Sequence, residues 1–382
     1  MAHSGVVSFL ADLVAIPSVN PSLVEGGAGE GAIAGAIATW MRRQGFDVDV
    51  HEVLPGRPNV VGIVDSGRPG PTVMFCGHSD TVGTDGMEAP FDPVIVDGRL
   101  FGRGAQDMKS GLAAMLFAAA DIANAGGPPT GRLLVACIID EEFASAGADA
   151  LVERWSADAA VITEPTGLAI GIAHKGFSAA EIVVHGRAAH GSRPDEGIDA
   201  IVRMGRVLSH LERLDERLRS APPVPLLGAA SLHASTIVGG GELSTYPARC
   251  SLQMERRTLP GEALTTAEDE LRAAVTELSA QDRHFEAEVR LLLARPPYAI
   301  PPEHWVTQAM VDAVREGNLD TRLEGLSYWT DAAVLGAARI PTVLFGPRGE
   351  GLHSPSESVL VDDVEVCRQV LGGFARSIAR PR

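Results

Sequence analysis

Acidic side chains gather where one strand-like segment ends. The stretch LLVACIIDEEF, residues 133–143, continues an apolar run into three consecutive carboxylates, Asp140, Glu141 and Glu142. Because side chains alternate between the two faces of a strand, Glu141 and Glu142 can share one site only where the strand is ending. We therefore expect a functional site at this strand end.

Other strand-like segments end in a similar way. AAVITEP ends with Glu164, which the following Pro165 favours in an extended conformation, and PTVLFGPRGEGLHSPSE carries His353 after a third predicted strand. TVMFCGHSDTV places His78 and Asp80 just beyond a fourth. In open α/β sheets the ligand crevice lies outside the carboxyl ends of the strands. The sequence therefore predicts that these side chains converge.

Two of these motifs also have ordinary explanations. Asp80 could anchor the second ring nitrogen of a metal-binding His78, but a loop histidine beside a chance aspartate gives the same pattern. In LFGRGAQDMKSGLAAML, Asp107 precedes a strongly apolar helix, where an N-cap aspartate is a sufficient reason for its presence. A carboxylate at that point could also bridge two cations, so both interpretations stay open for each motif.

Taken together, five side chains form a candidate ligand set: His78, Asp107, Glu142, Glu164 and His353. If Asp107 is shared, each of two metals receives one histidine, one terminal carboxylate and one bridging carboxylate. Such ligands suit Zn²⁺, our first expectation, and also Co²⁺ or Mn²⁺. Two such ions can bind and acidify one water between them.

Helical and strand-like segments alternate up to about residue 175, which predicts an α/β domain with a mixed, largely parallel sheet flanked by helices. Residues 176–292 instead follow the order β-α-β-β-α-β, the α+β split βαβ arrangement. From residue 293 onward, alternating helical and strand-like segments return. We therefore predict a catalytic domain formed by 1–175 and 293–382, with 176–292 inserted into it.

The composition narrows the function classes. The chain has 382 residues, 45% of them hydrophobic, and a formal net charge of −17, which disfavours nucleic acid and anionic membrane as partners. No apolar run is long enough to span a bilayer, and the N-terminal segment lacks the features of a signal peptide. The four cysteines lie far apart in sequence, and Cys76 and Cys137, which sit inside apolar strand-like runs, are expected to be buried thiols; a reducing cytoplasm is the expected setting.

A succession of motifs resembles the co-catalytic zinc metallopeptidase family, which includes acetylornithine deacetylase, succinyl-diaminopimelate desuccinylase, aminoacylase and glutamate carboxypeptidase. The similar stretches are GHSDTV, GRGAQDMKSG, DEEF, TEP, KGF, GRAAHGSRPDEGIDA, ERRTLPGE, WTDAAVLGAARIPTVLFGP and LHSPSES, which cover nearly the whole chain in order. The resemblance implies a catalytic domain with a lid. It also implies a cis peptide bond between Asp107 and Met108.

The resemblance also implies roles for the candidate residues. One metal would be held by His78, Asp107 and Glu164, and the other by Asp107, Glu142 and His353. Glu141 would then be the general base, which answers why two glutamates are adjacent: one binds metal and its neighbour takes a proton from the bridging water.

In the lid, the resemblance implies that His190 of GRAAHGSRP stabilises the oxyanion of the scissile carbonyl, often from the partner subunit of a dimer. It implies that Arg257 of ERRTLPGE binds a substrate carboxylate, with Arg256 on the other face of the strand. Ser244 of STYP stands where many members have asparagine, which changes a substrate contact. In SYWTDA, Tyr328 and Trp329 either narrow a pocket or pack in the core, and we favour packing for at least one.

These features predict a two-metal amidohydrolase that cleaves the amide bond of an N-acyl amino acid and forms a homodimer through its lid. A carboxypeptidase or dipeptidase acting on a short peptide is the alternative within the enzyme class. A metal-binding protein without catalysis is the alternative outside it. Glu164, where aminopeptidase members more often have aspartate, argues against an aminopeptidase.

Overall fold

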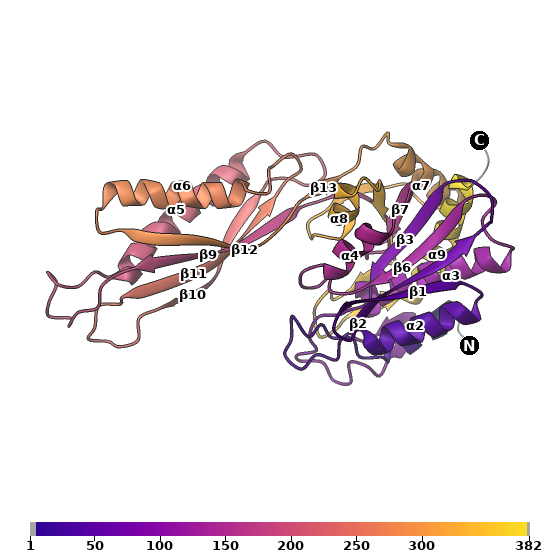
Figure 1. Cartoon of the computed structure of the whole chain (residues 1–382), viewed down its shortest axis with the longest axis horizontal. Coiled ribbons are helices and arrows are strands. Elements are labelled where there is room, and N and C mark those ends of the chain that lie inside the picture. Colours follow the sequence, from indigo (N-terminus) through magenta and orange to yellow (C-terminus); the bar gives the residue numbers. More distant parts are fainter. Residues whose placement is uncertain (1–4, 380–382) are drawn as a thin grey trace. The chain divides into compact units, whose positions relative to one another are not determined.

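A computed structural model describes residues 5–379, and the chain divides into two units (Figure 1). The first unit comprises Met1–Ile172, Ile300–Glu324 and Thr330–Arg382, and the second comprises Ala173–Ala299 and Gly325–Trp329. The domain division that the sequence predicts, with an insertion at 176–292, remains a proposal.

A nine-stranded sheet forms the centre of the fold, in the order β1-β2-β6-β3-β7-β15-β8-β13, with β14 beside β8. Strands β6, β3, β7 and β15 are parallel, and the strands toward both edges are antiparallel to their neighbours. The bounds are β1 Asp47–Leu54, β2 Arg57–Asp65, β3 Thr72–His78, β6 Arg132–Ile138, β7 Ala159–Ile162, β8 Ile170–His174, β13 Tyr298–Ala299, β14 Leu323–Leu326 and β15 Thr342–Leu344.

Helices cover this sheet. They are α1 Gly5–Val14, α2 Gly31–Arg43, α3 Ser110–Asn124, α4 Ala146–Arg154, α7 Trp305–Glu316, α8 Ala332–Ala337 and α9 Val361–Ile378. Helix α3 packs against β3, β6 and α9, and is buried along almost its whole length. Its sequence is rich in alanine and leucine on every face, which is typical of a helix enclosed in the core. This helix makes a rigid support for the loop that precedes it.

A smaller sheet has the order β16-β17-β5-β4. Its strands are β4 Val94–Val96, β5 Arg99–Phe101, β16 Gly349–Glu350 and β17 Ser358–Leu360. The antiparallel pairing of β17 with β5 brings the chain near residue 358 beside the chain near residue 101. Two loops that are distant in sequence are therefore held side by side.

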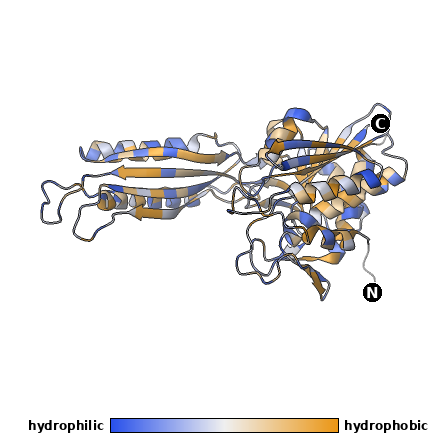
Figure 2. Cartoon of the chain, turned by 60° about the horizontal axis from the view of Figure 1, so that its bottom comes forward, coloured by the Kyte–Doolittle hydropathy of each residue, from blue (hydrophilic) through white to orange (hydrophobic). Residues whose placement is uncertain are grey.

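The second unit is an antiparallel sheet of order β10-β11-β9-β12 with two helices. Its elements are β9 Gly176–His185, α5 Ala200–Ser220, β10 Ser231–Gly239, β11 Arg249–Thr258, α6 Thr266–Gln281 and β12 Glu286–Arg295. Apolar residues from β9, β11 and both helices form one core, including Ile182, Met204, Leu252 and Leu271. Hydrophobic and hydrophilic residues are mixed along these elements (Figure 2), and buried residues alternate with more exposed ones along β11.

The predicted α/β fold with a mixed sheet and the predicted β-α-β-β-α-β order of the second unit are confirmed. Strand β1 is an edge strand in which Asp47, Asp49 and His51 alternate with valines, so it has no continuous apolar run. All four cysteines are buried free thiols, as expected for Cys76 and Cys137. Within residues 5–379, every helix is too short or too polar to cross a membrane.

Candidate metal centre

Four of the candidate residues stand at or just beyond the carboxyl ends of three parallel strands. His78 is the last residue of β3, Glu141 and Glu142 follow the end of β6 closely, and Glu164 lies two residues beyond β7. Because β6, β3 and β7 are adjacent and parallel, their ends meet at one edge of the sheet. The convergence predicted for these residues is therefore found.

Asp107 lies in a short irregular turn, Ala105–Lys109, before α3. The peptide bond between Asp107 and Met108 is cis, as expected, and both residues have non-helical backbone angles. The N-cap interpretation of Asp107 is wrong, because the N-cap of α3 is Lys109, which makes no side-chain capping bond. The turn instead leaves the Asp107 carboxylate free to face the strand ends.

His353 does not follow the end of β15, which corrects the sequence prediction. Strand β15 ends at Leu344, and His353 lies in the turn between β16 and β17 of the smaller sheet, with a φ of 59°. The reason is that Gly349 and Glu350 form an additional short strand paired with β17. The pairing of β17 with β5 then brings this turn toward Asp107.

The Asp107 carboxylate lies between two imidazoles. Its Oδ1 is 3.1 Å from Nε2 of His78, and its Oδ2 is 3.1 Å from Nε2 of His353. One carboxylate thus presents a different oxygen to each histidine. This is the arrangement that a bridging ligand between two metal ions requires.

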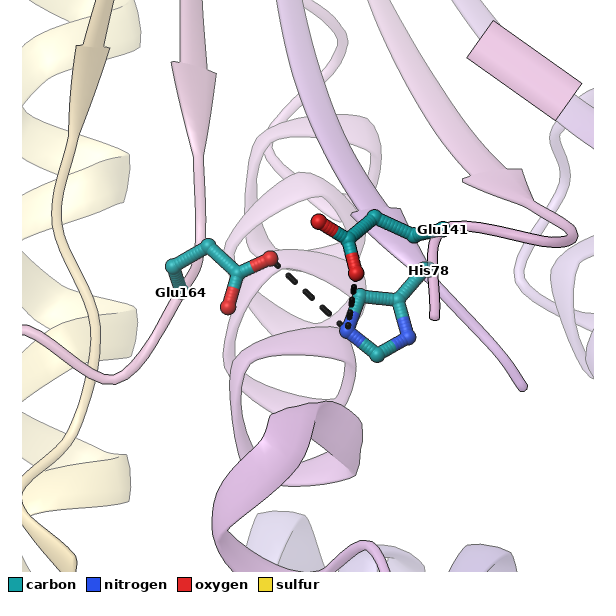
Figure 3. A group of neighbouring side chains, drawn as sticks. All are labelled: His78, Glu141 and Glu164. Atoms are coloured by element: carbon teal, nitrogen blue, oxygen red, sulfur yellow. Dashed lines mark ion pairs between the residues drawn. The ribbon is translucent and has the colours of Figure 1, made fainter. Parts of the chain in front are cut away.

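The glutamates complete two clusters around these histidines. Glu164 Oε1 is 3.7 Å from His78 Nε2, and Glu142 Oε2 is 3.3 Å from His353 Nε2. Glu141 Oε2 is 3.9 Å from His78 Nε2 (Figure 3). His78 forms one compact group with Glu141 and Glu164, and another with Asp107 and Glu142. By geometry alone, Glu141 could therefore bind metal as well as act as a base.

The pKa shifts in the cluster indicate that its buried carboxylates lack compensating positive charge. Burial, reinforced by the neighbouring carboxylates, raises the pKa values of Glu141 and Glu164 well above their ordinary value and also raises the pKa of Glu142. Burial opposes the charge on His78, but its hydrogen bonds to Asp107 and Asp80 hold its pKa well above 6.5. In the absence of metal ions, protons on these glutamates and on His78 supply the positive charge that the buried cluster needs. Buried carboxylates in such numbers are ordinarily paired or bind metals.

One buried oxygen without a hydrogen-bond partner indicates whether these residues can bind a metal ion. Glu142 Oε1 is buried and has no hydrogen-bond partner among residues 5–379. An unpaired carboxylate oxygen beside two histidines and two other carboxylates is a free ligand position. The mixture of imidazole and carboxylate donors suits zinc, cobalt or manganese.

Asp80 anchors the second ring nitrogen of His78, as predicted, and also holds the turn of the two glutamates. The ring nitrogen Nδ1 of His78 is 3.0 Å from the backbone carbonyl of Asp80 and 3.5 Å from its carboxylate. The fully buried carboxylate also accepts hydrogen bonds from the backbone N–H groups of Glu141 and Glu142, at 3.2 Å each. Asp80 therefore holds both the His78 ring and the turn that carries the adjacent glutamates.

Sequence reasoning missed a second carboxylate of this kind, Glu357. It is 1% exposed, and its two oxygens accept bonds from the backbone N–H groups of Gly104, Gln106 and Asp107, and from Arg103. Glu357 lies four residues after His353, so it fastens the turn of one histidine ligand to the turn of the bridging aspartate. Glu357 belongs to the LHSPSES motif, but the sequence gives no sign of its hydrogen-bond partners, which lie about 250 residues earlier in the chain.

The remaining predicted residues belong to the second unit. His190 and Ser244 are exposed neighbours: Gly191 donates to the carbonyl of Ser244, and His190 Nδ1 lies 2.8 Å from the Ser192 hydroxyl. Arg257 is part-exposed, with its guanidinium over the Phe177 ring. Trp329 is buried and donates to the carbonyl of Pro296, so the expected packing role is found for one of the two aromatic residues.

Metal-free protein should lose stability as pH rises from about 4.5 to about 10. The raised pKa values of Glu141, Glu142 and Glu164 let the fold keep protons that the unfolded chain releases above 4.5. His78 keeps its proton above 6.5, and His353 keeps its own up to its raised pKa of about 10. These groups make the folded state bind more protons in this window and lower its stability toward the upper end, whereas the buried Lys109, whose pKa falls to about 7, acts in the opposite sense above pH 7.

Urea titration of chelator-treated protein at several pH values measures this slope. Protein loaded with two metal ions is the control, because its ligands are already deprotonated in the fold and the slope should flatten or reverse. Equal slopes with and without metal would contradict the assignment of these residues as a metal centre.

The chain is similar to known proteins along nearly its full length. The family described as Peptidase family M20/M25/M40 matches residues 74–377. An acetylornithine deacetylase of Proteus mirabilis (strain HI4320) is 29% identical over 376 residues, which cover 96% of this chain and 95% of that protein. An acetylornithine deacetylase of Vibrio campbellii (strain ATCC BAA-1116) is 31% identical over 369 residues, with 93% of each covered.

Solved structures share the fold at lower identity. A tripeptidase from Staphylococcus aureus has a TM-score of 0.82 and 20% identity, with 98% of both chains covered. Human carnosine dipeptidase 1 has a TM-score of 0.75 and 20% identity, covering 98% of this chain and 96% of that one.

Proposed function

Because this chain belongs to the M20/M25/M40 peptidase family, we propose that it removes the acyl group from an N-acyl amino acid. It is a hydrolase of amide bonds. The observation that carries the proposal is the Asp107 carboxylate, which offers one oxygen to each of two histidines beside an uncommitted glutamate. Relatives that match almost the whole chain are acetylornithine deacetylases, which supports a deacylase over a peptidase.

We assign one metal position to His78, Asp107 and Glu164, and the other to Asp107, Glu142 and His353. When two divalent ions are bound, they acidify a water and polarise the scissile carbonyl. Asp107 keeps the two positions at a fixed separation, because its turn is fastened by Glu357. Zn²⁺ is our first choice of ion, with Co²⁺ or Mn²⁺ as alternatives.

Glu141 acts as the general base and then as the acid. Its carboxylate lies in the cluster while its backbone N–H is held by Asp80. In the metal-free protein burial raises the pKa of Glu141. The role of proton acceptor from water and donor to the leaving nitrogen rests on its position beside His78.

Arg257 recognises the free carboxylate of the amino acid. Its guanidinium is part-exposed, rests on the Phe177 ring and pairs with the Glu255 carboxylate at 2.7 Å. The adjacent Arg256 is 2% exposed and is paired with both Glu262 and Glu270. Arg256 is therefore committed to the fold, whereas Arg257 has one part-exposed carboxylate partner and is the arginine that we assign to substrate. Ser244, exposed beside His190, contributes to the choice of substrate.

His190 stabilises the oxyanion, and we propose that a homodimer supplies it. Strand β10 is an edge of the second-unit sheet and is exposed along most of its length, including Ile237 and Val238. An unpaired, partly apolar edge is a natural place for a second copy to add a strand.

A substrate panel tests the proposal. Protein loaded with zinc, cobalt or manganese is incubated with N-acetyl and N-succinyl amino acids and with dipeptides, and the released amine is measured. Release from N-acyl amino acids at the highest kcat/KM supports the deacylase. Faster cleavage of dipeptides would identify a dipeptidase, and no release from any substrate would contradict an amidohydrolase.

Arg257→Lys should raise KM for substrates with a free carboxylate by about tenfold or more, because an ammonium group cannot replace a bidentate guanidinium. Steady-state kinetics and thermal unfolding are measured together. The melting temperature should change little, since Arg257 is not buried.

Arg256→Lys is the matched control for this prediction. It should lower the melting temperature and leave KM near the wild-type value, because it weakens the buried pairs with Glu262 and Glu270. If Arg256→Lys raises KM and Arg257→Lys does not, the assignment of the two arginines is reversed.

A further inference from the structure

We propose that Asn20 is a positioning residue for the adjacent glutamates Glu141 and Glu142, acting through Asp80. Its role in catalysis rests on the proposed function of those glutamates. Asn20 is completely buried, and its side-chain amide links the two carboxylates that shape their turn.

The contacts of Asn20 form a clamp on the turn. Its Nδ2 donates to Asp80 Oδ2 at 2.8 Å and to Asp140 Oδ1 at 3.1 Å. Asp80 receives the backbone N–H groups of Glu141 and Glu142. Asp140 begins the same turn, with a φ of 68°, and its carbonyl accepts bonds from residues 143–145. The Asn20 amide nitrogen therefore connects Asp140, at the start of the turn, to Asp80, whose carboxylate binds the backbone of Glu141 and Glu142.

Buried charge explains why an amide is needed there. Asp80 and Asp140 are two nearly inaccessible carboxylates that share Asn20 as a neighbour, and a like charge at position 20 would repel both. The Arg57 guanidinium donates hydrogen bonds to Asp140 and to Glu30 and so offsets part of this negative charge. The Asn20 amide is the donor that contacts both Asp80 and Asp140.

Asn20 is itself held firmly. Its backbone N–H donates to the carbonyl of Thr81, the next residue after Asp80, and Thr81 in turn donates to Ser18. Its side-chain Oδ1 accepts from the backbone of Ser22 at 2.9 Å. The segment thus runs beside the end of β3, and both ends of the Asn20 amide are fixed. A side chain restrained in this way can define the position of its partners.

Asn20→Asp keeps the size and removes both donated hydrogen bonds, and Asn20→Ala removes the amide without adding charge. Each should lower kcat about 10- to 100-fold, the usual cost of losing such a supporting contact. KM should stay within about twofold, because Asn20 does not reach substrate, and two metals should still bind. Metal content and steady-state kinetics are measured for both variants.

Asn59→Ala is the matched control. Asn59 is also buried beside the end of β6, but among residues 5–379 its side chain bonds only to the backbone of Ile139 and Gly147. It should lower the melting temperature and keep the wild-type kcat. If it lowers kcat as much as Asn20→Ala, the effect is general loosening and the proposal fails. The proposal also fails if neither Asn20 variant folds, since Asn20 would then be a stability residue.

A measurement without substrate separates this proposal from the proposed function. The visible absorption of cobalt-loaded protein reports the ligand geometry around the ions, including Glu142. It should change in Asn20→Ala and remain unchanged in Asn59→Ala. This result supports the positioning role even if the wild-type protein hydrolyses no N-acyl amino acid. An unchanged spectrum together with wild-type kcat in folded Asn20→Ala would overturn it.

Discussion

Glu141→Ala should lose nearly all turnover while the protein still binds two metal ions. The expected loss is about 10²–10⁴-fold, the usual contribution of a general base, and larger if the same group also protonates the leaving nitrogen. Glu141 lies in the cluster without a unique ligand position, because Asp107, Glu142 and Glu164 already accompany the two histidines. Removing it should therefore disable proton transfer and leave the ligands in place.

The structure makes this test more demanding than the sequence suggested, because Glu141 is 3.9 Å from His78 and could act as a ligand. Metal content after dialysis, measured on Glu141→Ala and Glu142→Ala side by side, distinguishes the roles. We expect Glu142→Ala to bind one ion weakly and Glu141→Ala to retain both. Equal metal loss in the two variants would show that the pair is assigned wrongly.

The sequence predicts the strand-end part of this site well. His78, Glu142 and Glu164 follow apolar runs that can only be buried strands, and parallel neighbours place such ends together. Asp107 was ambiguous, because an aspartate before an apolar helix is also a common N-cap. Only the geometry of the turn, in which Lys109 and not Asp107 is the N-cap residue of α3, decides between the two interpretations.

What the sequence could not predict is the pairing of buried charges. Arg57 lies 27 residues from Glu30 and 83 from Asp140, and no spacing rule connects them. Any of the many charged residues could have been solvated, and only the packing shows which are buried. The same holds for Glu357, whose partners lie about 250 residues earlier in the chain. His353 was assigned to the wrong strand because the two-residue strand β16 is too short to give a pattern.

The residues of the second unit could act on the metal centre of their own chain or on that of a partner chain. Every candidate metal ligand belongs to the first unit, whereas His190, Ser244 and Arg257 belong to the second. The exposed His190 side chain is hydrogen-bonded to Ser192, and its backbone forms a bridge with Thr245. A group that stabilises an oxyanion must come within hydrogen-bond distance of it, from its own chain or from a partner.

Mixing two inactive variants, His190→Ala and Glu141→Ala, should restore activity if His190 acts on the partner's metal centre. His190→Ala alone should lose about 10²–10³-fold in kcat, the usual cost of removing an oxyanion donor. In a mixed dimer one site regains both groups, so random subunit exchange should return about a quarter of wild-type activity. Exchange is confirmed independently with differently tagged subunits, and activity is measured against mixing time. If tagged heterodimers form and no activity returns, His190 acts within its own chain or takes no part in the reaction, because a site in cis stays deficient in every dimer.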